Sequence, residues 1–371
     1  MKKNLISILL ASLLLLPGCA DYLDQDPEDL NSIQKIFSSD IDTRKWYNRI
    51  FSTDFMVQEM HYSSQSPYFW CTDESAYTME PFVRNISEGK MSPDNYYGYT
   101  GYNLYLFVRY YQAIRHCNIF LENVDKCVEL GEVERRSMRA EARFMRAYYH
   151  YLLLRSYGPI PIATASRTTD QIAATQARTP FADCVEWISS EIDWVCENGM
   201  PTTRNESLDL GLPTVGAARA IQSRMLLMAA SPLFNGNAVY RNWTNRDGTQ
   251  LIPQTYDKEL WKVAADAAKT VIDMTEYELL KPKEGATFDE IVDNFRAVTT
   301  TWGADRNKEI IWAQPNTVQW YARCALPARW FGWNGRYSLA IDMVNDFFMA
   351  DGSESRPLEE WFADRKFSAE P

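Results

Sequence analysis

The most regular hydrophobic pattern in the chain lies between Arg139 and Ile162. On a helix with about 100° per residue, the apolar side chains form two stripes on opposite sides, with a narrow basic stripe between them. The first stripe contains Ala140, Phe144, Ala147, Tyr151 and Leu154, the second Met138, Ala142, Met145, Tyr149 and Leu152, and the basic stripe Arg139, Arg143, Arg146 and His150. A helix with two apolar faces must pack on both sides, so we expect an interior helix of a layered helical stack.

Start and stop signals predict further helices before and after this one. Gly158 is expected to end the central helix with a left-handed cap, and Pro159 prevents its continuation. A helix start is also predicted at Thr179, as N-cap, with Pro180 in the first helical position. The predicted helices span residues 40–50, 102–123, 132–157, 179–196, 214–230, 257–274 and 338–349, and a short strand-like run covers 307–313.

Particular faces of these helices carry their own expectations. The basic stripe could bind an anion, but helix residues three or four apart more often pair with carboxylates of a neighbouring helix, which we favour. Arg224 falls on the apolar side of its helix and would need a carboxylate partner. On helix 102–123 one line contains Phe107, Tyr111, Ile114, Asn118 and Leu121, and on helix 257–274 the inward residues are expected to be Trp261, Ala265, Ala268, Val271 and Ile272.

The helix predictions together indicate a mainly all-α fold. Because a short turn joins helices 102–123 and 132–157, these two form an αα-hairpin. The helix pairs resemble tetratricopeptide repeats, although no regular period of about 34 residues is present. We expect one domain over residues 39–371, made of a tetratricopeptide-like helix-pair scaffold at about 40–275 with long irregular loops, and a loop-rich portion at about 276–371.

Two irregular stretches, 68–99 and 320–337, are rich in aromatic and polar residues and show no sustained period. Long structured loops are usually functional, and sugar rings stack on Trp and Tyr while their hydroxyls bond to Asn, Asp and Arg. A purely structural role, pinning loops to the scaffold, is the alternative for each of these residues. The candidate ligand-binding residues are Trp70, Asp73, Asn95, Tyr96, Tyr97, Trp320, Trp330, Trp333 and Arg336.

The N-terminus has the pattern of a lipoprotein signal peptide. Two lysines precede an apolar run from Leu5 to Leu16, which is too short to span a bilayer because a span needs about 20 residues. The following Pro-Gly-Cys19 completes a sequence that resembles a bacterial lipobox. We therefore expect residues 1–18 to be a signal peptide, Cys19 to be lipidated and 19–38 to form a tether, with an ordinary secreted protein as the alternative.

Composition and charge restrict the classes of ligand. The net charge of −11 argues against nucleic acid as a partner, since phosphate contacts need Lys and Arg. The chain has 12 Trp and 21 Tyr, more than a core usually uses, so some rings should be exposed for contact. The three His show no metal-ligand spacing, and we expect no metal and no cofactor.

The cysteines other than Cys19 are expected to be mostly buried thiols. Cys117 and Cys127 would lie about 15 Å apart on one helix, and Cys184 and Cys196 about 18 Å apart on another. Both separations exceed the roughly 7 Å between Cα atoms that a disulfide allows.

Several motifs resemble one known family. The run Arg-Ala-Glu-Ala-Arg-Phe-Met-Arg-Ala-Tyr-Tyr from Arg139, together with Tyr-Gly-Pro-Ile-Pro at 157–161, resembles the signature helix of the SusD-like (RagB/SusD) family. Similar matches are Cys-x-Asp-Tyr-Leu-Asp at 19–24, the helix segment 114–124 and the run 341–352. The family consists of outer-membrane lipoproteins that capture nutrients, mostly glycans.

The resemblance implies a non-catalytic protein of the outer membrane, exposed at the cell surface and attached through its lipid anchor only. Its implied partners are a glycan ligand and a TonB-dependent transporter of the SusC type, to which the glycan is delivered. Family members usually continue well past the equivalent of Pro371, so the resemblance also implies that the C-terminal part of the family's fold is absent here.

Two other functions stay open at this point. A repeat scaffold could bind only peptide or protein, in which case an apolar groove rather than exposed rings would form the site. A glycoside hydrolase would need a carboxylate pair, and the 49 acidic residues of the chain leave such a pair open. No nucleophile motif, metal triad or Gly-rich phosphate loop is present in the sequence, so we expect no enzyme.

Overall fold

The structure is a computed structural model. The parts of the chain that it describes are residues 33–52, 55, 75–77, 89–90, 106–167, 177–204, 209, 211–279, 281, 283–293, 308–313, 337–339, 343, 346–348 and 352–354.

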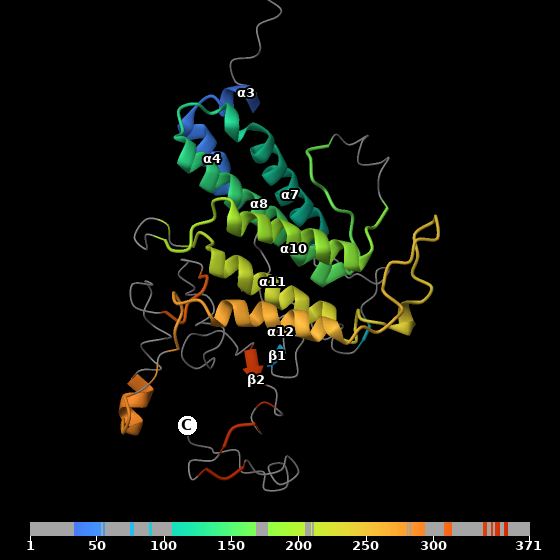
Figure 1. The fold of residues 1–371 in the computed structure, drawn as a ribbon, viewed down its shortest axis with the longest axis vertical. Coiled ribbons are helices and arrows are strands. Elements are labelled where there is room, and N and C mark those ends of the chain that lie inside the picture. Colours follow the sequence, from blue (N-terminus) through green and yellow to red (C-terminus); the bar gives the residue numbers. More distant parts are fainter. Residues whose placement is uncertain are drawn as a thin grey trace, which may run out of the picture.

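The described chain forms a stack of helices in which each long helix packs on its neighbours in sequence (Figure 1). The long helices are α4 (Asp40–Ile50), α7 (Leu106–Asn123), α8 (Glu132–Tyr157), α10 (Phe181–Glu197), α11 (Val215–Ala230) and α12 (Glu259–Ile272). Short elements are the helix α3 (Ile33–Ile36), the 3₁₀ turns η1 (Val124–Lys126) and η2 (Ala238–Tyr240), and the strands β1 (Ser75–Tyr77) and β2 (Tyr337–Leu339). The mainly all-α fold is therefore confirmed.

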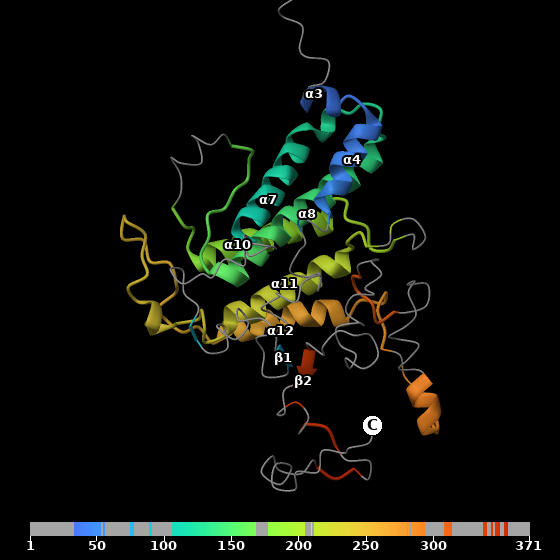
Figure 2. The same ribbon diagram turned by 180° about the vertical axis from the view of Figure 1, so that it is seen from behind.

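Helix α8 is the interior element that the sequence predicts, with the predicted bounds. It packs against α7 on one side and α10 on the other, and both of its apolar stripes are buried. The turn through η1 makes α7 and α8 an antiparallel hairpin, visible from both sides in Figures 1 and 2. Burying a large apolar side chain contributes roughly 1.5–3 kcal/mol, so the large residues of the two stripes stabilise the core substantially.

The N-terminal caps of α4 and α10 lie one residue away from the positions expected from the sequence. In α4 the N-cap is Ser39, whose side chain accepts a hydrogen bond from the Asp42 amide, and Asp40 is the first helical residue. In α10 the N-cap position is Pro180, because Thr179 instead donates its amide to the Ile160 carbonyl in an isolated β-bridge. In α11 the N-cap is Thr214, whose Oγ1 accepts a hydrogen bond from the Ala217 amide.

Gly158 ends α8 as predicted, but with a different backbone conformation. Its φ of 65° is positive, whereas its ψ of −140° lies outside the left-handed helical region that the sequence predicts. A Cβ atom at this position would lie 3.1 Å from the Trp243 ring. The chain therefore turns sharply, and segment 159–162 returns along α8 toward α7.

Helix α12 lies at the end of the described stack and is less buried than the sequence predicts. It packs on α11 through one face, where Ala264 is buried. Trp261, Ala265 and Ile272 are exposed rather than inward, because no described helix covers the second flank of α12. Arg224 of α11 is also exposed, so its predicted position on a buried face is wrong.

The part of the chain after residue 275 differs most from the predictions. Residues 308–313 form turns and bends instead of a strand, and Ser338 and Leu339 belong to β2 instead of a helix. Strand β2 pairs in antiparallel fashion with β1, with Ser75 opposite Leu339 and Tyr77 opposite Tyr337. Figure 2 shows this two-stranded sheet next to α12.

Trp312 packs residues 308–313 against the helical stack. Its ring lies 5.3 Å from that of Tyr148 and 5.8 Å from that of Phe144, both on α8. Its Nε1 donates a hydrogen bond of 2.8 Å to the Gly211 carbonyl, which precedes α11.

The cysteines of the described chain agree with the expected thiols. Cys117, Cys127, Cys184 and Cys196 are free, and the first three are buried. Burial raises the pKa of Cys117 to about 12. Cys71 and Cys324 lie outside the described residues. Among the helices that are described, none combines the length and the apolar character that a bilayer crossing requires.

Candidate functional site

The basic stripe of α8 pairs with carboxylates, as the sequence predicts. Glu191 of α10 accepts hydrogen bonds from Arg143 at 2.7 and 2.9 Å and from Arg146 at 2.6 Å. The Arg143 guanidinium also lies 3.9 Å from the centre of the Trp194 ring. Arg139 pairs with Asp125 of η1. This stripe therefore joins α8 to its neighbours.

The same network holds segment 161–164 against the helices. Arg146 donates from Nη1 to the Asn118 side chain at 3.0 Å and to the Thr164 carbonyl at 3.1 Å. Asn118 in turn donates to the Ala163 carbonyl at 3.1 Å. The Ala163 amide donates to Nε2 of His150 at 3.1 Å, and Nδ1 of His150 lies 2.8 Å from the Arg146 carbonyl. His150 is therefore neutral with its proton on Nδ1.

Burial and charge explain the pKa directions in this network. Burial lowers the pKa of His150 to about 3, with the Arg146 charge acting in the same direction. For Glu191, burial raises the pKa, but hydrogen bonds and charge from Arg143 and Arg146 outweigh it, so the pKa lies below its ordinary value. The network is thus a neutral histidine beside a buried carboxylate with two guanidinium partners.

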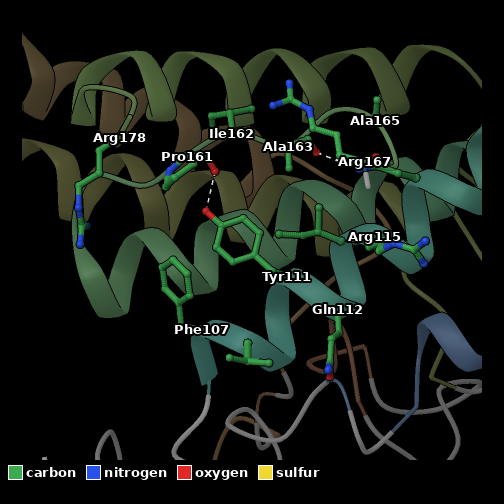
Figure 3. A pocket seen from close by; sticks show the side chains of 13 residues that line it. Phe107, Tyr111, Gln112, Arg115, Pro161, Ile162, Ala163, Ala165, Arg167 and Arg178 are labelled. Atoms are coloured by element: carbon green, nitrogen blue, oxygen red, sulfur yellow. Dashed lines mark hydrogen bonds between the residues drawn. The ribbon is translucent and has the colours of Figure 1, made fainter. Parts of the chain in front are cut away.

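A pocket of about 520 Å³ lies beside this network, between the N-terminal half of α7 and segment 161–167 (Figure 3). The described residues that line it are mostly apolar: Phe107, Val108, Tyr111, Ile114, Pro161, Ile162, Ala163 and Ala165, with Gln112, Arg115, Asn118, Arg167 and Arg178 as the polar members. Its volume is in the range that ligand pockets usually have.

Rings form one wall of the pocket. The Phe107 ring lies 4.7 Å from that of Tyr111 and 5.4 Å from that of Tyr157. The Tyr111 hydroxyl donates a hydrogen bond of 2.6 Å to the Pro161 carbonyl, and burial raises the pKa of that hydroxyl. At one end of the pocket, Arg178 donates to the carbonyls of Tyr157 and Pro159.

All the ligand-binding residues predicted from the sequence lie outside the described residues, and so does Cys19. These are Trp70, Asp73, Asn95, Tyr96, Tyr97, Trp320, Trp330, Trp333 and Arg336. Strands β1 and β2 do belong to the described chain. Strand β1 lies within the first ring-rich stretch, residues 68–99, and β2 begins at the last residue of the second ring-rich stretch, residues 320–337. Their pairing brings one end of the second stretch beside the first.

The sequence pattern does not identify the pocket residues as a site. The sequence does align the residues of one wall of the pocket. On the predicted helix 102–123 these residues lie along one line: Phe107, Tyr111, Ile114 and Asn118. The opposite wall, from Pro161 to Arg167, follows from the turn at Gly158 and has no periodic signal. Within the described residues, no cluster of three or more His, Cys, Asp or Glu could hold a metal ion.

Comparison with known proteins places the chain in a family. The model of a SusD-like family, described as "Starch-binding associating with outer membrane", matches residues 21–227, which is more than half of the sequence. The chain belongs to the SusD-like family. A comparison with curated proteins found no match.

Solved structures show the same SusD-like fold. The protein BT4246 is similar with a TM-score of 0.69 and 25% sequence identity, over 90% of this chain and 62% of that one. A SusD-like carbohydrate-binding protein (BF0978) from Bacteroides fragilis NCTC 9343 has a TM-score of 0.60 and 18% identity, over 86% of this chain and 55% of that one. This SusD-like chain therefore spans less than two thirds of the length of these structures.

Proposed function

We propose that this protein is a cell-surface lipoprotein that binds a glycan and delivers it to a SusC-type TonB-dependent transporter, without catalysing a reaction. The family match over residues 21–227 carries this proposal, because that family is described as starch-binding and associated with the outer membrane. The pairing of β1 with β2 supports a glycan site formed jointly by the two ring-rich stretches.

The proposed domain organisation follows from the N-terminal sequence. Residues 1–18 are the signal peptide, Cys19 carries the lipid, 19–38 form a tether and 39–371 form the SusD-like domain. Several acyl chains on one cysteine anchor a protein stably, whereas a single chain binds a membrane only marginally. The anchor holds the protein at the outer membrane, where an outer-membrane transporter is within reach.

The glycan proposal is tested by affinity gel electrophoresis of residues 20–371, the mature chain without its lipidated Cys19, in gels that contain different polysaccharides. We expect one class of glycan to retard the protein. A triple variant, Trp320→Ala/Trp330→Ala/Trp333→Ala, should lose this retardation because the sugar loses its stacking surfaces.

A matched control removes a ring elsewhere. Trp261→Ala changes a tryptophan of α12 that is 41% exposed, and this variant should be retarded like the unchanged protein. If a folded mature chain is retarded by none of the polysaccharides, glycan capture by this chain is wrong. If the triple variant is retarded as strongly as the unchanged protein, the second ring-rich stretch is not part of the glycan site.

A further inference from the structure

The pocket beside α7 offers apolar contact at its mouth as well as at its floor. Phe107 and Val108 are 38% and 49% exposed, so two apolar side chains of the first turns of α7 face solvent there. Ile114 at the floor is buried. Surface apolar residues that border an apolar pocket are typical of interaction sites.

The polar side chains of the pocket mostly bind the protein itself. Tyr111 donates to the Pro161 carbonyl, and Asn118 donates to Ala163 while accepting from Arg146. Arg178 donates to backbone carbonyls of the turn that follows α8. A saccharide needs many hydrogen-bond partners for its hydroxyls, and these groups offer few. An apolar side chain of a ligand needs none.

The charged side chains in the described lining of the pocket are all positive. Arg115, Arg167 and Arg178 belong to its lining, and the described lining residues include no carboxylate. Figure 3 shows Arg178 at one end of the pocket and Arg115 with Arg167 toward the other. Glu122, further along α7, accepts hydrogen bonds from the amide and hydroxyl of Ser166. In a chain with a net charge of −11, such a positive rim attracts a negatively charged ligand.

We propose that this pocket is a docking site for an acidic peptide segment of a protein partner, with a bulky apolar side chain of that segment inserted between Tyr111 and Ile162. Acidic side chains on either side of the inserted residue lie at the arginines. The described lining shares no residue with the glycan site proposed above, and neither proposal depends on the other.

The test selects a phage-displayed library of random hexapeptides on the mature chain and measures binding of the selected peptides, labelled with fluorescein, by fluorescence anisotropy. We expect selected peptides that combine Asp or Glu with Phe, Leu or Trp. Val108→Asp and Arg115→Glu should each weaken binding at least tenfold, since each places a negative charge at the rim.

Two control variants make the same chemical changes at exposed positions outside the pocket. Val133→Asp lies in the first turn of α8, where Val133 is 84% exposed, and Arg246→Glu lies in an exposed loop. Both should bind like the unchanged protein. Peptides with Lys in place of their acidic residues should regain affinity for Arg115→Glu, a reversal that a loss of folding could not produce.

Three results would overturn the proposal. The first is a selection that yields no peptides combining acidic and apolar residues. The second is that the selected peptides bind Val108→Asp and Arg115→Glu as tightly as the unchanged protein. The third is loss of glycan retardation in Val108→Asp, which would make the pocket a sugar site. Thermal unfolding of each variant, within about 2 °C of the unchanged protein, establishes that the variants are folded.

Discussion

Gly158 meets two constraints that glycine alone satisfies. Its φ of 65° with ψ of −140° is a conformation that side chains with a Cβ rarely adopt. The space where a Cβ would lie is next to the Trp243 ring, at 3.1 Å. The turn at this residue sets the course of segment 159–167 and therefore one wall of the pocket.

Gly158→Ala should destabilise the protein by about 1–3 kcal/mol, because the backbone is strained and the Trp243 ring must move. Chemical denaturation measures the change. Gly131→Ala is the matched control: Gly131 has a φ of −64° and an added Cβ would meet no atom within 4 Å, so its stability should change by less than about 0.5 kcal/mol. Equal effects of the two substitutions would show that the Gly158 conformation is not constrained.

At the residue scale, the sequence predicts the features that depend on residues close together in the chain. The pattern of residues identifies Gly158 as the end of α8 and the arginine stripe as a partner of carboxylates. It does not identify Trp243 as the ring against Gly158, since that contact joins residues far apart in the chain. The prediction of Thr179 as a cap is wrong because its bridge to Ile160 has no local signal.

At the scale of the elements, Glu191 joins α10 to α8 through two ion pairs. The carboxylate is buried and binds both Arg143 and Arg146, and Arg146 continues to Asn118 of α7. Removing one partner of a buried ion pair leaves an uncompensated charge, which costs more than the pair contributes.

Glu191→Gln should lower the free energy of unfolding by about 3 kcal/mol, because two partly or fully buried guanidinium groups lose their counter-charge. Glu186→Gln provides the control on the same helix, since Glu186 is exposed and should change stability by less than about 0.5 kcal/mol. Urea denaturation compares the two. A Glu191→Gln protein as stable as the control would mean that the cluster is replaceable by neutral hydrogen bonds.

An element is predicted more accurately when its hydrophobic pattern extends over more residues. Helix α8 is 26 residues long, its two apolar stripes extend from Met138 to Leu154, and its predicted bounds are correct. For α12 the helix is predicted but its buried face is not, because the sequence does not show that α11 is its main described neighbour. Residues 338–339 have a helical pattern, yet they pair with β1 from a distant part of the chain.

The stability of the whole molecule should depend on pH through His150, which is buried, and His116, which is partly buried. Burial lowers the pKa of His150 to about 3 and that of His116 to about 4. In the unfolded chain a histidine binds a proton near pH 6.5, so between pH 6.5 and these lower values the unfolded state binds more protons. Stability is therefore expected to fall as the pH falls through this window.

His150→Gln tests this dependence, because the glutamine carbonyl can still accept a hydrogen bond from the Ala163 amide. The variant should be less stable at pH 7 but lose less stability between pH 7 and pH 5, by about 1–2 kcal/mol compared with the unchanged protein. Urea denaturation at pH 7, 6 and 5 gives the change in the free energy of unfolding with pH for both proteins. Carboxylates contribute equally to the two proteins, so parallel slopes would contradict a role for His150.

The attachment of Trp312 has a consequence for the order of folding. Helices α7 to α12 pack on neighbours in sequence, and such local contacts form quickly. The hydrogen bond of Trp312 to Gly211 joins residues 101 positions apart, so its formation waits for the later chain to be synthesised and to return to α8. Burial of this indole against Tyr148 is thus a natural marker of the last stage of folding, after the helical stack has already assembled.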